Sequence, residues 1–122
     1  FLQSPKLLDR FYADRRNPLV AFAGQMTGVE GYVESTASGY LAAVAMAAKV
    51  QGRPIPEFPR ETAVGALGLY ISDESVSNFQ PMNINFSIIS PLEKRIRKKA
   101  EKNLAIAQRS LEIIDRMAEQ GI

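Results

Sequence analysis

One stretch of the sequence, FAGQMTGVEGYVESTASG at residues 22–39, constrains the fold of this chain most. An apolar run, residues 19–23, enters it and an alanine-rich run, residues 32–50, leaves it, which predicts a strand, a glycine-rich turn and a helix. Glycines permit positive φ and a close ligand approach, and the first turn of a helix offers unpaired N–H groups. The pattern therefore indicates either a flavin or anion site or a tight structural turn. Its four glycines are Gly24, Gly28, Gly31 and Gly39.

The first half of the chain predicts further elements on both sides of this turn. Ser4-Pro5 is typical of a helix start, so we expect residues 6–11 to form one or two helical turns. Because residues 19–22 are apolar in succession, we expect a strand buried on both faces, as in a mainly parallel sheet. The helix over residues 32–50 should stop at Gly52, and apolar spacing predicts a short helix over residues 60–71. The expected fold class is α/β.

The second half predicts one strand and one long helix. Apolar and polar side chains alternate over residues 82–88, which is typical of a half-buried strand. Asn83 and Asn85 would share one face of that strand, where they either meet solvent or donate hydrogen bonds to a flavin, folate or RNA group. The capping-box pattern Ser90-Pro91-Leu92-Glu93 predicts a helix from there to about Glu119. Its expected apolar stripe is Leu92, Ile96, Ala100, Leu104, Ala107, Leu111, Ile114 and Ala118.

Positive charge gathers at the start of that expected helix. Residues 93–102 hold six basic side chains and two acids, against a net charge of only +2 for the chain. Such a cluster is either a solvated helix face or a phosphate-binding surface. The candidate RNA-binding residues are Lys94, Arg95, Arg97 and Lys98.

Composition excludes several kinds of chemistry for these residues. The sequence has no Cys and no His, which removes thiolate metal sites, cysteine nucleophiles and the commonest general base. We therefore predict no catalytic side chain and no metal ligand among these residues. No apolar run approaches the roughly 20 residues that cross a bilayer, so we expect a cytoplasmic protein.

Several long sequence words carry a family resemblance. GQMTGVEGYVES at residues 24–35 with ASG at 37–39, FPRETAVGAL at 58–67, FQPMNINF at 79–86 and the segment 4–9 are close to words of one family. The chain resembles the folate- and FAD-dependent tRNA (uracil-5-)-methyltransferases, the Gid family. The resemblance implies the C-terminal part of a Rossmann-like FAD-binding domain, followed by a helix, a short strand and a long C-terminal helix.

The same resemblance implies the chemistry and the site. Methylenetetrahydrofolate would donate one carbon and FAD, reduced by NAD(P)H, would help to place a methyl group on C5 of a T-loop uridine in tRNA. Gly24 and Gln25 would lie beside the ribityl and phosphate part of FAD. The turn from Thr27 to Gly31 would face the isoalloxazine ring, because a helix N-terminus favours the negative charge that develops on a reduced flavin. The implied cofactor-binding residues are Gly24, Gln25, Thr27, Gly28, Val29, Glu30 and Gly31.

Phe1 in place of Met and the likeness to one part of a longer family lead us to expect a fragment that is inactive alone. We expect residues 1–53 to be the C-terminal edge of an FAD-binding domain, 54–90 a connector with a short helix and strand, and 91–122 an amphipathic helix. The expected partners are tRNA, the missing N-terminal part and, through an exposed sheet edge, a second copy of the chain. Three alternatives remain open: an FAD-dependent wobble-uridine tRNA modification enzyme, a ribosomal RNA uridine methyltransferase, and a non-enzymatic helical binding module.

Overall fold

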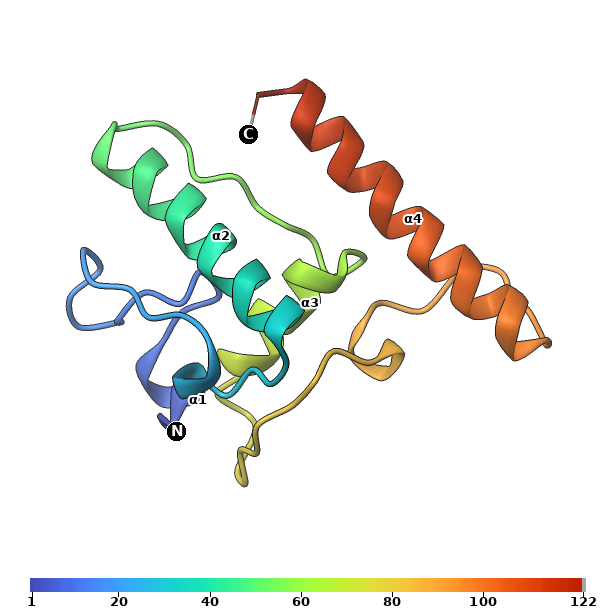
Figure 1. The fold of residues 1–122 in the computed structure, drawn as a ribbon, viewed down its shortest axis with the longest axis horizontal. Helices are drawn as coiled ribbons and strands as arrows, with labels where there is room; N and C mark the ends of the chain where they lie inside the picture. Colours follow the sequence, from blue (N-terminus) through green and yellow to red (C-terminus); the bar gives the residue numbers. More distant parts are fainter. Residues whose placement is uncertain (122) are drawn as a thin grey trace.

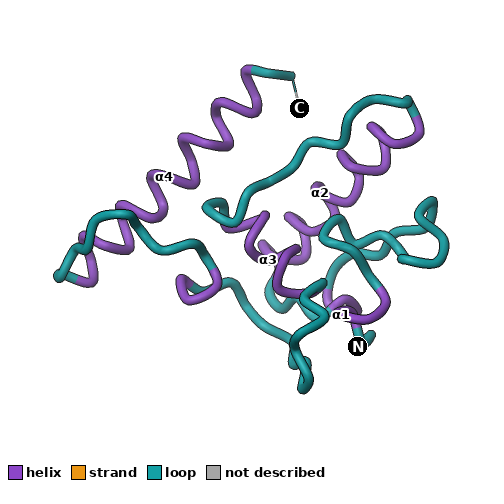
Figure 2. Tube along the Cα trace, turned by 180° about the vertical axis from the view of Figure 1, so that it is seen from behind, coloured by secondary structure: helices purple, strands orange, loops and turns teal. Residues whose placement is uncertain are grey.

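Helices joined by long irregular segments form the fold of the computed structural model, which describes residues 1–121. Figure 1 shows α2 and α3 in contact near α1, with α4 along one side of the molecule. Over the described range the trace contains helix and loop and no strand (Figure 2). The elements are α1 (Ser4–Leu7), the 3₁₀ turn η1 (Gln25–Thr27), α2 (Tyr32–Val50), α3 (Ala63–Ile71), the 3₁₀ turn η2 (Phe86–Ile88) and α4 (Lys99–Glu119).

The central helix, α2, has the bounds that its alanine-rich sequence predicts. Alanine is the best helix former, and small side chains on the inner face let neighbouring segments pack closely. The helix ends at Val50 with Gln51 as its C-cap, and Gly52 follows with φ of +68°, so the predicted glycine stop is confirmed. Buried Leu41, Ala42, Ala45 and Ala48 form its inner face.

The core forms where α2 and α3 meet the N-terminal segment. Leu8 and Tyr12 are buried there together with Leu41 and Ile71. Gly68 of α3 lies directly against the backbone of Arg10, where an added Cβ would overlap the carbonyl oxygen. The short helix predicted over residues 60–71 is confirmed as α3, which begins at Ala63 because the Thr62 side chain accepts a hydrogen bond from the backbone N–H of Gly65.

Both predicted strands are wrong for the described residues. Residues 19–22 contact residues 12–14 through one antiparallel bridge, Ala13 with Ala21, and two hydrogen bonds beside it. Residues 82–88 form one parallel bridge, between Met82 and Val29, and then turn into η2. A strand is defined by a neighbouring ladder, and the described chain supplies only single bridges to these apolar segments. The α/β fold class is therefore not seen over residues 1–121.

The predicted helix boundaries at Ser4 and Ser90 also need correction. Helix α1 spans Ser4–Leu7 and does not continue to residue 11. The long helix begins at Lys99, and tertiary hydrogen bonds hold the irregular segment before it in place. The N–H of Ser90 donates to the carbonyl of Arg60, and the guanidinium of Arg109 donates to the carbonyls of Ser90 and Pro91. Residues 90–98, which include the capping-box sequence, thus form an irregular segment linked to α4 through Arg109, and this segment is called the strap below.

The inner face of α4 differs in part from the predicted stripe. Ile106 is buried, and Ile114 and Met117 pack against the core, whereas Leu104 and Leu111 remain mostly exposed. The hydroxyl of Ser110 accepts a hydrogen bond from the N–H of Ala63, which links α4 to the start of α3. Side chains at steps of three and four still define the packed face, but it is rotated away from the two leucines. None of the helices described between residues 1 and 121 has the length and apolar content that crossing a membrane requires.

Candidate functional site

The glycine-rich turn contains three residues with positive φ. Gly24, Gly28 and Gly31 have φ values of +80°, +98° and +105°, in a region that side-chain-bearing residues rarely adopt. The carbonyl oxygen of Gly24 accepts hydrogen bonds from both the N–H (2.9 Å) and the hydroxyl (2.7 Å) of Thr27, which closes η1. These glycines therefore shape a compact turn that ends at the first residue of α2.

The predicted cofactor-binding residues of this turn divide into a buried and an exposed set. Thr27, Gly28 and Val29 are buried, and the carbonyl of Thr27 accepts a hydrogen bond of 2.6 Å from the hydroxyl of Ser4. Thr27 and Val29 have no exposed surface, backbone included, so these residues shape the turn and do not offer a surface to a ligand. The set that faces solvent is Gln25, Glu30 and Gly31, with Gly24 half-buried.

The start of α2 presents apolar side chains that the sequence reasoning did not select. Tyr32 is 96% exposed and Val33 is 79% exposed, directly after the N-cap residue Gly31. Next to the glycine-rich turn, this exposed aromatic ring offers a surface for a planar ligand or another chain segment. The sequence signal that could have found this surface is an aromatic residue, Tyr32, immediately after the last glycine of the turn, Gly31.

A carboxylate clamp joins the turn to the segment that follows α3. The Glu34 carboxylate accepts hydrogen bonds from the Asn83 amide (3.2 Å) and from the N–H of Ile84 (3.1 Å). The Asn83 amide nitrogen also donates to the carbonyl of Glu30 (2.8 Å). Between the same two segments, the N–H of Glu30 donates a hydrogen bond to the carbonyl of Met82. Glu34 therefore holds two distant segments together.

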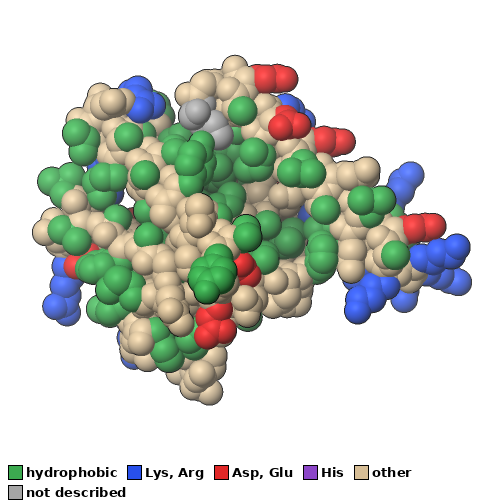
Figure 3. All heavy atoms as spheres, viewed as in Figure 1, with side chains coloured by type: hydrophobic (Ala, Val, Ile, Leu, Met, Phe, Trp, Pro, Cys, Tyr) green, Lys and Arg blue, Asp and Glu red, His purple; other side chains and the backbone are tan. Residues whose placement is uncertain are grey.

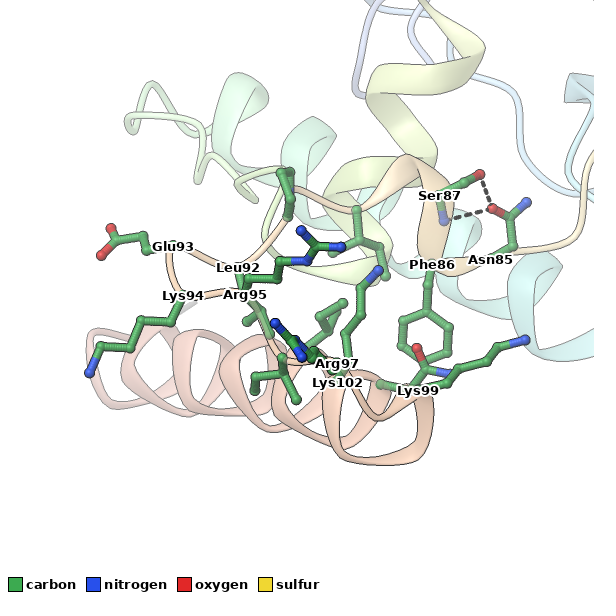
Figure 4. A pocket seen from close by; sticks show the side chains of 15 residues that line it. Asn85, Phe86, Ser87, Leu92, Glu93, Lys94, Arg95, Arg97, Lys99 and Lys102 are labelled. Atoms are coloured by element: carbon green, nitrogen blue, oxygen red, sulfur yellow. Dashed lines mark hydrogen bonds between the residues drawn. The ribbon is translucent and has the colours of Figure 1, made fainter.

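The two asparagines predicted to share a strand face have separate positions. The Asn83 amide nitrogen is engaged in the clamp, whereas the Asn85 oxygen accepts hydrogen bonds from the N–H (2.9 Å) and the hydroxyl of Ser87. Asn85 is the N-cap of η2, so its amide nitrogen points away from the turn that its oxygen closes (Figure 4). Asn83 lies at the glycine-rich turn and Asn85 lies at a second site beside α4.

The Glu34 clamp predicts an acid-dependent stability. A hydrogen bond to its own backbone, followed by those from Asn83 and Ile84, lowers the pKa of Glu34 below its ordinary value of 4.5. A lowered folded pKa contributes stability above the ordinary pKa, and that stability is lost as the pH falls through the folded pKa. We expect Glu34→Gln to lose less stability than the unchanged protein between about pH 5 and pH 3 in thermal unfolding. Glu57→Gln, at an exposed position, is the control. If the unchanged protein and Glu34→Gln lost equal stability on acidification, this role of Glu34 would be contradicted.

The basic cluster lies on the strap and not on a helix. Lys94, Arg95, Arg97 and Lys98 are exposed and precede the first turn of α4. Figure 3 shows Lys and Arg side chains gathered at the end of the molecule where the strap and α4 meet. Lys94, Arg95 and Arg97, but not Lys98, line a pocket of about 1000 Å³, far from the glycine-rich turn in sequence, together with residues of η2. The structure therefore presents two separate candidate sites.

The chain is similar to one family model and to several curated proteins. Residues 1–54 match the family model described as glucose inhibited division protein A. Over all 122 residues, the chain is 51% identical to the methylenetetrahydrofolate–tRNA-(uracil-5-)-methyltransferase TrmFO of Natranaerobius thermophilus and covers 28% of it. It is 52% identical over 114 residues to TrmFO of Bacillus cereus, covering 93% of this chain and 26% of the relative.

A third relative gives the same result. TrmFO of Streptococcus agalactiae is 50% identical over 117 residues, which is 95% of this chain and 26% of that protein. The chain thus spans about a quarter of the length of the curated relatives that it matches. The resemblance to the Gid family is confirmed.

Proposed function

We propose that these residues form part of a flavin-dependent RNA methyltransferase that uses methylenetetrahydrofolate to methylate C5 of a T-loop uridine in tRNA. The observation that carries the proposal is identity of about half the residues along the whole chain to proteins named for that reaction. The chain itself supplies no cysteine or histidine. Its contribution would therefore be to bind cofactor and RNA, while residues outside this chain carry out the covalent steps.

The glycine-rich turn is the proposed flavin site. The N–H of half-buried Gly24 donates to the Ser38 hydroxyl. The exposed residues Gln25 and Gly31 and the start of α2 offer N–H groups and a positive dipole end. Those groups favour the phosphates of FAD and the negative charge of its reduced ring. Thr27, Gly28 and Val29 are buried and would shape the turn around the cofactor without contacting it. NAD(P)H would supply the reducing equivalents.

The chain would divide by role into the three segments that its sequence indicates. Residues 1–53 would form the edge of the FAD-binding domain, residues 54–90 a connector, and residues 91–122 a segment made of the basic strap and α4. The exposed apolar side chains of Tyr32, Val33 and Leu104 would contact the remainder of a protein of the relatives' length or a second copy of the chain.

A chimera tests the proposed function directly. Residues 1–122 replace the aligned segment of the Natranaerobius thermophilus relative, with which they share 51% identity. We expect the purified chimera to be yellow and to transfer labelled carbon from methylenetetrahydrofolate to unmodified tRNA in the presence of NAD(P)H. A folded but colourless chimera would sink the flavin assignment. A yellow chimera that labels a ribosomal RNA fragment and not tRNA would show that ribosomal RNA is the substrate.

Charge reversal tests the RNA contact of the strap. We expect simultaneous replacement of Lys94, Arg95, Arg97 and Lys98 by Glu to weaken tRNA binding, because phosphate contacts and released counterions are lost. The slope of log affinity against log salt should become shallower by about 0.7 to 0.9 for each contact removed. Filter binding over a salt series measures both. The control reverses four basic residues elsewhere on the surface, Lys6, Arg16, Lys49 and Arg53. If the two variants had equal tRNA affinity and equal salt dependence, the basic residues of the strap would be a solvated surface and not an RNA contact.

A further inference from the structure

The pocket at the basic strap combines positive charge with an exposed aromatic ring. It has a volume of about 1000 Å³ and lies between η2, the strap and the first turns of α4. Five cationic side chains and one acidic side chain line it, so its electrostatic potential is positive. Those cations are Lys94, Arg95, Arg97, Lys99 and Lys102.

The aromatic ring belongs to Phe86, which is 42% exposed. Figure 4 shows the ring beside the Lys99 side chain, with Arg97 and Lys102 along the same hollow. The ring is held in this position because η2 is anchored on both sides. Asn85 caps its first turn, and the buried side chain of Ile88 fixes it to the core. An apolar ring presented to solvent from a fixed turn, with cationic side chains in the same hollow, is a stacking platform.

We propose that this pocket holds one unpaired nucleotide of the RNA substrate, with its base stacked on Phe86 and its flanking phosphates bound by Arg97, Lys99 and Lys102. Sequence-tolerant binding of single strands uses this combination of aromatic side chains for bases and cations for the backbone. A surface for phosphates alone would need no aromatic ring. The inference rests on the proposed function, since that function supplies RNA as the partner.

Stacking on Phe86 requires a base whose face is free. Unpaired nucleotides in RNA loops offer such a face, whereas a paired base in a duplex does not. The pocket therefore selects a loop or a strand end over a continuous helix.

Phe86→Ala tests the stacking step. The full chain is titrated with a fluorescently labelled single-stranded RNA oligonucleotide and with an abasic oligonucleotide of the same length and charge. We expect Phe86→Ala to weaken binding of the base-containing oligonucleotide by about tenfold and to leave the abasic one unchanged. Replacement of both Lys99 and Lys102 by Glu should weaken both oligonucleotides and reduce the salt dependence. Circular dichroism establishes that each variant keeps its helix content, and Phe86→Leu, which keeps an apolar side chain without a ring, should behave like Phe86→Ala.

Each alternative outcome is distinct. If Phe86→Ala binds both oligonucleotides like the unchanged chain while the lysine variant weakens both, the nucleotide pocket is overturned and the RNA contact of the proposed function stands. If the lysine variant binds no worse than a charge-matched control at Arg16 and Arg53, the pocket is overturned and so is this RNA interface. The flavin content of the chimera is independent of both results and tests the remainder of the proposed function.

Discussion

Gly31→Ala is expected to weaken FAD binding by roughly tenfold or more in the chimera. Gly31 has φ of +105°, where an L-residue is strained by about 1–2 kcal/mol, and 1.4 kcal/mol is a factor of ten in affinity. An added Cβ would also overlap the Glu34 carboxylate and approach the Asn83 amide to 3.0 Å. The substitution would therefore distort the turn and release the clamp that holds it. The flavin absorption spectrum after gel filtration and an FAD titration of the apoprotein measure the loss.

Gly52→Ala is the matched control for this result. Gly52 also has positive φ, +68°, but an added Cβ there meets nothing within 4 Å. It lies at the opposite end of α2 from the turn. We expect a similar backbone strain with flavin binding retained. Equal retention of FAD by both variants would show that the glycine-rich turn is structural, which was the alternative interpretation of its sequence.

Gly65→Ala is expected to destabilise the fold by about 3 kcal/mol, the upper part of the range for overpacking a filled site. An added Cβ would overlap the backbone carbonyl oxygens of Phe58 and Pro59, and backbone atoms cannot turn aside as a flexible side chain can. Helix α3 would have to move away from the connector that it packs against. Thermal and urea unfolding measure the loss, which corresponds to roughly 10 °C in Tm for a chain of this size.

Gly39→Ala provides the opposite control within a helix. An added Cβ at Gly39 lies 3.8 Å from the Cβ of Ala23, which is ordinary van der Waals contact. Alanine is favoured over glycine in a helix interior by up to about 1 kcal/mol, so this variant should be as stable as the unchanged protein or more stable. If Gly65→Ala matched Gly39→Ala, the close contact between α3 and the connector would be contradicted.

The sequence predicts best the elements whose own residues favour one backbone conformation. Alanine-rich α2 appears with its predicted bounds, because its residues favour helix without outside help and glycines stand at both ends. The candidate flavin turn was found for a similar reason. Positive φ at Gly24, Gly28 and Gly31 is a property that only glycine accepts readily, so the residue type itself reveals the turn.

The errors occur where local patterns depend on distant partners. The apolar residues 19–22 and the alternating residues 82–88 satisfy the patterns of strands, but a ladder needs a neighbouring strand and the described chain offers isolated bridges. The capping box at Ser90 was overridden by Arg109, which lies 19 residues away and binds the carbonyls that a helix would have used. Local propensity yields when tertiary hydrogen bonds compete for the same backbone groups.

The sequence by itself determined the central helix, the positions of positive φ and the family resemblance, because each resides in residue types and their order. Only the tertiary structure decided which of the candidate side chains are buried, exposed or engaged in hydrogen bonds. It turned Thr27 and Val29 into the core, engaged Asn83 with Glu34, and placed Phe86 among the cations of the strap. These outcomes depend on contacts between segments that are about 10 to 50 residues apart, and such contacts are set by the packing of the whole chain rather than by any local pattern.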